Sequence, residues 1–295
     1  MTESNPFQTP ESDVTAKQIN SQTNALNNNV TCHTVPMQNG AIWVIDGFRN
    51  FMISPFTWSL VVFLYLAMLG TLSMLPFVSI ISSIIAPIFL AGLMLCAREN
   101  KEQQTFQVKQ LFQGFSLNGG KLAGLGALNL GVMIVLFMII GIIAVVILLG
   151  NIGSVENFIT MLENNSFSQN DALQFILVIL IATLFIIPIT MAFWFAPALV
   201  IFHDVDIFAS LKLSFMGCLK NVMPYLIYSL VYLLVYVIAA IPIFILISFI
   251  GDTGIESNPL ILLLMILVGT AELFILASLF FTSVYASYED IFLTE

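Results

Sequence analysis

The stretch IPITMAFWFAPALVIFHDVDIFASLKLSFMGCLKNVMPYLIY, residues 187–228, contains every kind of segment from which this chain is built. It begins with the end of an apolar run, which closes with Trp-Phe-Ala-Pro at residues 194–197. A charged patch and an amphipathic segment follow, and a new apolar run starts after Pro224. This succession is typical of a chain that crosses a membrane repeatedly, with short amphipathic connectors on one side. The acidic, basic and histidine residues of the stretch are His203, Asp204, Asp206, Lys212 and Lys220.

The composition of the whole chain supports the same class. Hydrophobic residues make up 59% of the sequence and charged residues 8%, and the mean hydropathy is +1.01. Soluble domains carry about 25% charged residues. The formal net charge of -9 does not indicate an acidic soluble surface here, because the charges are confined to the ends of apolar segments. The sequence therefore predicts an all-α polytopic membrane protein.

The number of membrane spans follows from the charge-free intervals. No charged residue occurs between Arg49 and Arg98, which is too long an interval for one helix because about 20 residues cross the hydrocarbon core. Pro76 offers a break, although the serines after it also permit a re-entrant loop in place of a second span. We expect a six-helix membrane domain over residues 41–290. The predicted spans are 56–75, 78–96, 122–149, 172–200, 225–250 and 260–286.

The two ends of the chain are polar. Residues 1–40 are rich in Asn, Gln, Ser and Thr and contain few large apolar side chains, so they are expected to form a disordered cytoplasmic tail. No apolar segment follows the first methionine, and we therefore expect no cleaved signal peptide. Residues 291–295 are expected to form a short C-terminal tail.

Six spans with a cytoplasmic N-terminus place every basic residue on the cytoplasmic side. This satisfies the positive-inside rule and argues against the re-entrant loop, which would move Arg98 and the basic residues up to Lys121 across the membrane. Both termini are then cytoplasmic. The eight basic residues are Lys17, Arg49, Arg98, Lys101, Lys109, Lys121, Lys212 and Lys220.

Three similar units recur along the chain. Each begins with an amphipathic segment, DGFRNF at Asp46, FQGFSL at Phe112 and KLSFMGCLKN at Lys212, and continues with two spans. The second spans end alike, in LAGLMLCARE, WFAPALVIFHD and FTSVYASYED. This pattern predicts three repeats of an interfacial helix plus a transmembrane hairpin. The alternative is that all short cytoplasmic connectors look amphipathic. In the first unit, Ile42, Trp43, Ile45, Phe48 and Phe51 are expected to share a lipid-facing side, opposite Asp46, Arg49 and Asn50.

The segments DGFRNF, PIFLAGLMLCARE and MAFWFAPALVIFHDVDIFASLKLSFMGCLKNVMPYL resemble a family of uncharacterised bacterial inner-membrane proteins. That family is distantly similar to the membrane region attached to some glycerophosphodiester phosphodiesterases. The resemblance covers roughly residues 41–290 and is most specific between Trp194 and Lys220. It implies a six-helix domain in the bacterial plasma membrane and no established activity. No catalytic residue is carried over from it.

Glu272 is the strongest single candidate for function, because it lies well inside the last apolar run. A carboxylate at that depth costs about 2.5 to 3.5 kcal/mol and is a functional candidate by default. It is expected either to serve proton or cation coupling, or to bind another helix through Asn129, Thr183 or Thr190.

Other candidates carry weaker signals. Pro188, like Pro87 and Pro242, removes a helical hydrogen bond within a span; such breaks line substrate sites in transporters but more often kink a helix. His203 and Asp204 suggest metal or proton handling, yet a solvated interfacial cluster near Lys212 is the plainer interpretation. No metal-ligand spacing, cofactor-binding motif or nucleophile signature occurs in the sequence, and basic residues are too few for nucleic-acid binding.

These patterns favour a non-enzymatic envelope scaffold or accessory protein. The alternative is a small transporter or lipid-handling permease that uses an intramembrane carboxylate. Membrane lipids are the expected partners, with an envelope protein or a second copy of the chain as further candidates, and no cofactor or metal is expected.

Overall fold

The computed structural model describes residues 30–74, 78–164, 168–249 and 259–293, and within these ranges it contains helices and no strands. Six of the helices are long and apolar enough to cross a membrane. The elements in chain order are α2 (Asn39–Ile53), α3 (Pro55–Ser73), α4 (Val78–Gln103), the 3₁₀ helix η1 (Val108–Phe112), α5 (Gln113–Leu117), α6 (Gly119–Ile152), α7 (Val155–Glu163), α8 (Gln169–Trp194), α9 (Ala196–His203), α10 (Ile207–Lys220), α11 (Val222–Ser248) and α12 (Pro259–Phe292).

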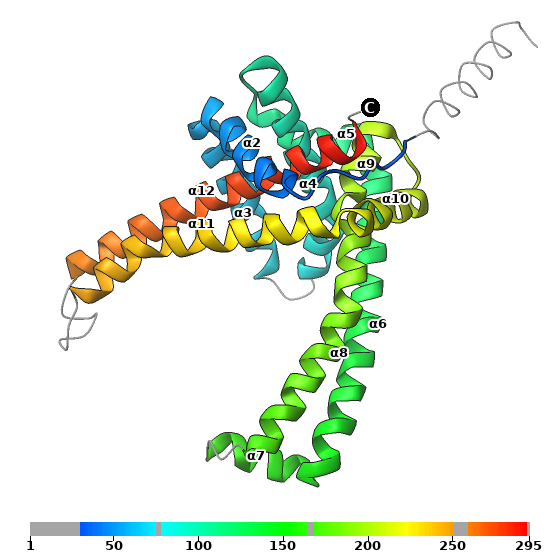
Figure 1. Ribbon diagram of the computed structural model, residues 1–295, viewed down its shortest axis with the longest axis vertical. Helices are drawn as coiled ribbons and strands as arrows, with labels where there is room; N and C mark the ends of the chain where they lie inside the picture. The colour runs from blue at the N-terminus through cyan, green and yellow to red at the C-terminus, as the bar shows by residue number, and fades with distance from the viewer. Residues whose placement is uncertain (1–29, 75–77, 165–167, 250–258, 294–295) are drawn as a thin grey trace, which may run out of the picture.

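The spans form three hairpins, α3–α4, α6–α8 and α11–α12, that diverge from one end of the molecule (Figure 1). We call that end the hub; it contains α2, η1, α5, α9, α10 and the adjoining ends of the long helices. The largest fully buried side chains, among them Trp43, Trp58, Phe195 and Tyr288, belong to the hub. The outer parts of the α6–α8 and α11–α12 hairpins are covered by little besides their own partner helix (Figure 1). The three hairpins therefore share one core at the hub and separate beyond it.

The three units are arranged as a closed ring. The short helix of each unit packs on the second span of the preceding unit: η1 and α5 on α4, and α10 on α8 and α9. Helix α2 of the first unit packs on α12 of the last, which closes the ring. This cyclic packing gives the predicted repeats a structural basis.

Glycines at equivalent positions of the first two units both approach the backbone of the neighbouring span. A Cβ on Gly47 of α2 would lie 2.7 Å from the Ser283 Cα, and one on Gly114 of α5 would lie 2.5 Å from the Ile88 carbonyl oxygen. Four residues before each glycine, a polar side chain donates to the acid that ends the neighbouring span: Trp43 to Asp290, and Gln110 to Glu99.

The third unit keeps the small residue and changes the acid's partner. Ser214 of α10 occupies the position of the two glycines, and its hydroxyl donates to the Met191 carbonyl at 2.7 Å. The acid Asp204 is bound instead by Lys121, whose Nζ lies 2.8 Å from Oδ1. Small residues at this position are needed because the short helix approaches the backbone of the span.

Helix α2 differs from the expectation in which of its faces is buried. Trp43 and Phe51 belong to the core, and Asn50 is buried too, donating to the Ala97 carbonyl at 3.0 Å. Ile45 and Phe48 are half exposed and face away from the core. The predicted single apolar face is thus two faces, because the packing of α2 on α11 and α12 buries Trp43 and leaves Phe48 exposed.

Several predicted boundaries also differ. The predicted span 172–200 is interrupted at Phe195, where α8 gives way to α9, and α12 continues to Phe292 through the start of the predicted C-terminal tail. The polar segment between the third and fourth spans contains the additional helix α7. The second predicted span is the continuous helix α4.

Part of the predicted N-terminal tail contacts the hub. The His33 backbone N–H donates to the Ile291 carbonyl at 2.9 Å, and Asn221 binds the Val35 N–H and the His33 carbonyl. These three hydrogen bonds hold residues 33–35 against the hub. The predicted disordered tail therefore does not extend to residue 40. Residues 1–29 of that tail lie outside the described residues.

Candidate functional site: an apolar cavity between the hairpins

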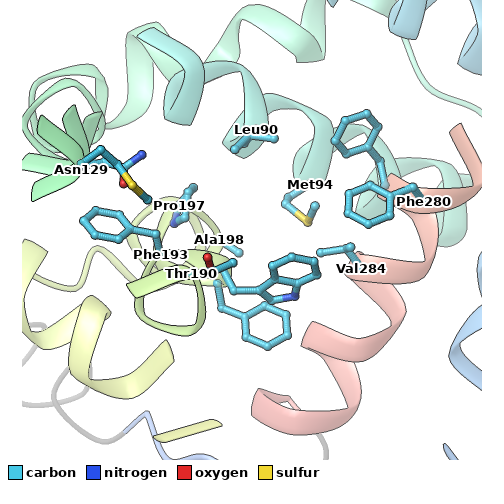
Figure 2. A pocket seen from close by; sticks show the side chains of 13 residues that line it. Leu90, Met94, Asn129, Thr190, Phe193, Pro197, Ala198, Phe280 and Val284 are labelled. Atoms are coloured by element: carbon cyan, nitrogen blue, oxygen red, sulfur yellow. The ribbon is translucent and has the colours of Figure 1, made fainter. Parts of the chain in front are cut away.

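A cavity of about 230 Å³ lies where the hairpins meet (Figure 2). Five helices line it, α4, α6, α8, α9 and α12, and they come from all three units. No charged side chain is among the lining residues. These are Leu90, Met94, Asn129, Met133, Thr190, Phe193, Trp194, Phe195, Pro197, Ala198, Phe280, Phe281 and Val284.

The backbone that borders the cavity is broken at Phe195. Helix α8 ends at Trp194, and α9 starts at Ala196 with Pro197 in its first turn. The Ser214 hydroxyl accepts from the Phe195 N–H at 2.9 Å while it donates to the Met191 carbonyl. These two bonds satisfy backbone groups that the break frees, which is the condition for irregular backbone at membrane depth. The repeat position in α10 thus stabilises the break.

Besides the Trp194 indole, two polar side chains line the cavity. The Thr190 hydroxyl donates to the Ile186 carbonyl of its own helix at 2.9 Å. The Asn129 Oδ1 is covered by protein and has no hydrogen-bond partner within the described part of the chain. The Trp194 Nε1 is likewise covered without a partner among the described residues. A polar group that is left unpaired in apolar surroundings is costly, so Asn129 and Trp194 are the anomalous groups of the site.

A second, lateral groove of about 380 Å³ adjoins the cavity on the far side of Trp194. The two spaces share Thr190 and Trp194. The indole ring stands edge-on to Tyr225 at 6.3 Å and to Phe280 at 5.9 Å between ring centroids, so it forms the partition between them. The groove is lined by Ile187, Thr190, Met191, Trp194, Cys218, Val222, Tyr225 and Leu226.

Cys218 in this groove is a free thiol, as is Cys96. Burial raises the pKa of the Cys218 thiol to about 12, so it stays protonated at neutral pH. A protonated buried thiol is a poor nucleophile and acts as a small apolar side chain.

Glu272 is half-buried on α12, and its Oε1 has no hydrogen-bond partner among the described residues. It lies two turns, about 12 Å along the helix, from Phe280 of the cavity, on the side toward the hairpin tip. Thr183 and Thr190, two of its expected partners, bond to carbonyls of α8 instead. The expected pairing is absent because α12 and the α6–α8 hairpin diverge beyond the hub (Figure 1).

The other predicted residues lie elsewhere, and none of them lines the cavity. Pro188 is inside α8, which continues past it, and the break is found at Phe195 instead. His203 ends α9 with its ring 6.4 Å from that of Tyr288, and its Nε2 is covered without a partner among the described residues. Asp204 turns away in a left-handed conformation, φ 52°, and binds Lys121, not Lys212. His203 and Asp204 therefore do not form one site: His203 lies beside Tyr288, and Asp204 binds Lys121.

Within the described ranges, no group of three or more His, Cys, Asp or Glu side chains is placed to hold a metal ion. The residues that sequence reasoning missed are those of the cavity itself. The sequence predicts Asn129 only as a partner for Glu272, although its isolation within a long apolar run is a signal of its own.

Comparison with known proteins agrees with the membrane architecture. The chain is similar to a probable inner membrane protein of Burkholderia thailandensis, with 26% identity over 206 residues that cover 67% of this chain and 73% of the relative. No family model matches the chain, and no solved structure matches it. With six helices able to cross a membrane, this protein is a bacterial multi-pass inner membrane protein.

Proposed function

We propose that this inner membrane protein handles lipids without catalysing a reaction, and that it takes a lipid's apolar chain into the cavity between its hairpins. The observation that carries the proposal is the cavity's uncharged lining at membrane depth. Leu90 lies eight residues, about 12 Å of helix, from Arg98 at the hub end of the same helix. The cavity is therefore within reach of acyl chains and closed to charged head groups.

The divergence of the hairpins supports access from the bilayer. The apolar part of α6, Gly119–Ile147, has 29 residues, and of its 18-residue apolar window only 6% is buried. At 1.5 Å per residue it is about 43 Å long, which exceeds the hydrocarbon core of about 30 Å and leaves room for the helix to tilt. Lipid must fill the space between hairpins that tilt apart, and this space leads to the cavity.

The scaffold hypothesis remains the second candidate, because one observation favours it. The outward faces of the short helices carry exposed aromatic side chains at equivalent positions, Phe48 at 50% and Phe115 at 45% exposure. Side chains in this position insert at the membrane interface or contact an envelope protein. The distant resemblance to the membrane region of glycerophosphodiester phosphodiesterases is part of the proposal only as a fold relationship. No hydrolytic residue is carried over.

Cavity-filling variants test the lipid proposal. Ala198→Phe and Met133→Trp place extra bulk in the cavity, and they are expected to remove a lipid that the wild type retains after gentle extraction. Native mass spectrometry measures the bound lipid. Ala127→Phe on the exposed side of α6 is the matched control and should keep it. Two cavity variants are used because Ala198 is 2% exposed and its replacement also strains the core.

Two results would contradict the proposal. Equal lipid loss in Ala127→Phe and in a cavity variant that remains monodisperse would mean that only annular lipid was observed. A stoichiometric protein partner without lipid would support the scaffold instead, with Phe48 and Phe115 as the residues to replace.

We also infer that the hub faces the cytoplasm. All basic residues of the described ranges lie in hub elements or at the hub ends of spans, whereas Glu156, Glu163 and Asp171 lie at the far end of the α6–α8 hairpin. In a variant without the three native cysteines, Glu156→Cys should react with an impermeant maleimide on intact spheroplasts. Ser116→Cys at the hub should react only after lysis. The reverse pattern would invert the topology.

A further inference from the structure

We propose that the ligand is a neutral lipid, a long apolar chain that ends in a hydroxyl or an undissociated carboxyl, and that the Asn129 amide binds this end. The inference rests on the proposed lipid-handling function and specifies its substrate class. It is carried by the uncharged cavity and by the unpaired amide within it.

The lining excludes a charged end. A phosphate or a carboxylate in the cavity would lose its hydration and meet no Lys, Arg or His, since none is among the lining residues. Transferring an unpaired charge to such surroundings costs far more than one or two neutral hydrogen bonds return. A phospholipid can therefore insert only an acyl chain, whereas a neutral polar end can enter completely.

Asn129, which is partly buried, differs from the buried asparagines of the described residues. Asn50, Asn100 and Asn221 each donate to a backbone carbonyl of another segment or of their own helix. Such bonds are what a structural asparagine provides. The Asn100 Oδ1 is also without a partner, but its Nδ2 is bonded, whereas the Asn129 side chain makes no hydrogen bond within the described residues, although it sits on a helix that packs against α4 and α8. The amide is available to a ligand and does not hold two helices together.

The Asn129 amide can donate or accept a hydrogen bond. A half-turn about its last torsion exchanges Oδ1 and Nδ2, so it presents an acceptor or a donor to the cavity. A hydroxyl or an undissociated carboxyl has both and suits either orientation. The Thr190 oxygen, which donates within α8, retains lone pairs for a second bond.

The arrangement of the lining matches an amphiphile with one polar end. Asn129 lies on one side of the cavity, and Phe280 and Val284 of α12 lie on the other, with Leu90 and Met94 between them (Figure 2). The polar end is thus fixed near α6, and the chain extends over apolar side chains toward Trp194 and the lateral groove.

The test compares two quenchers of equal length, 9,10-dibromooctadecanol and 9,10-dibromooctadecane, by their effect on the fluorescence of the full-length protein. Trp194 lines the cavity, whereas Trp43 and Trp58 are 1% and 0% exposed, so quenching reports chiefly on Trp194. The wild type should bind the alcohol about tenfold more tightly than the hydrocarbon, as one buried hydrogen bond provides. Asn129→Leu should abolish this ratio and leave hydrocarbon binding unchanged.

Controls separate this inference from the function on which it rests. Thr183→Val removes a polar side chain from the exposed part of α8 and should keep the tenfold ratio. Dibrominated phosphatidylglycerol should quench the fluorescence of the wild type and of Asn129→Leu equally. A wild-type ratio near one, or a ratio that survives in Asn129→Leu, would overturn the neutral-lipid inference while lipid handling stands. Absence of quenching by every probe would overturn both.

Discussion

Gly126→Leu is expected to prevent the normal association of the first two hairpins. A Cβ on Gly126 of α6 would lie 2.2 Å from the carbonyl oxygen of Ile84 in α4, and the next atoms it meets are also backbone. Backbone cannot rotate aside as a side chain can, so the two helices must separate. Overpacking costs about 1–3 kcal/mol and more where relaxation is blocked. We expect at least 3 kcal/mol, a fall of about 10 °C in the unfolding midpoint.

Gly131→Leu provides the matched control for this prediction. It lies on the same helix, and a Cβ there meets nothing within 4 Å. Its unfolding midpoint, measured by size-exclusion chromatography after heating in detergent, should remain within a few degrees of the wild type. Equal midpoints for the two leucine variants would show that α4 and α6 do not pack through Gly126.

Trp43→Ala is expected to open the ring of units where the first meets the last. Trp43 is 1% exposed, its Nε1 donates to Asp290 at 2.8 Å, and its ring lies 5.1 Å from that of Tyr225. Removal of a buried Trp costs about 3–5 kcal/mol. The substitution weakens the packing of α2, which connects the N-terminal unit to α11 and α12. The N-terminal unit should therefore also become more accessible to protease.

The conservative variant Trp43→Phe separates packing from hydrogen bonding. It retains most of the ring and loses the bond to Asp290, which also accepts from Asn39 at 2.8 Å. A bond to a charged group is worth about 1.5–3 kcal/mol, so the unfolding free energy should lie between those of wild type and Trp43→Ala. Wild-type stability and protease resistance in Trp43→Ala would mean that α2 does not close the ring.

The sequence by itself determined the membrane class, the six spans and the threefold arrangement of units. These depend on local properties that a bilayer enforces directly: a span needs about 20 apolar residues, and polar connectors cannot lie within the hydrocarbon. Similar segments around Gly47, Gly114 and Ser214 were visible as a repeat because each must approach the backbone of a span. The side chain at that position has to be small in every unit.

Tertiary structure alone decided which face of each short helix is buried and where the cavity lies. On α2 the apolar stripe that contains Trp43 and the one that contains Phe48 are similar in hydrophobicity, and only the packing on α11 and α12 distinguishes them. Asn129, Ala198 and Phe280 are remote in sequence, and they become neighbours because the hairpins converge at the hub and diverge beyond it. A local pattern encodes whether a segment is helical and apolar, whereas a cavity depends on the relative angles of several helices, which arise from their contacts with one another.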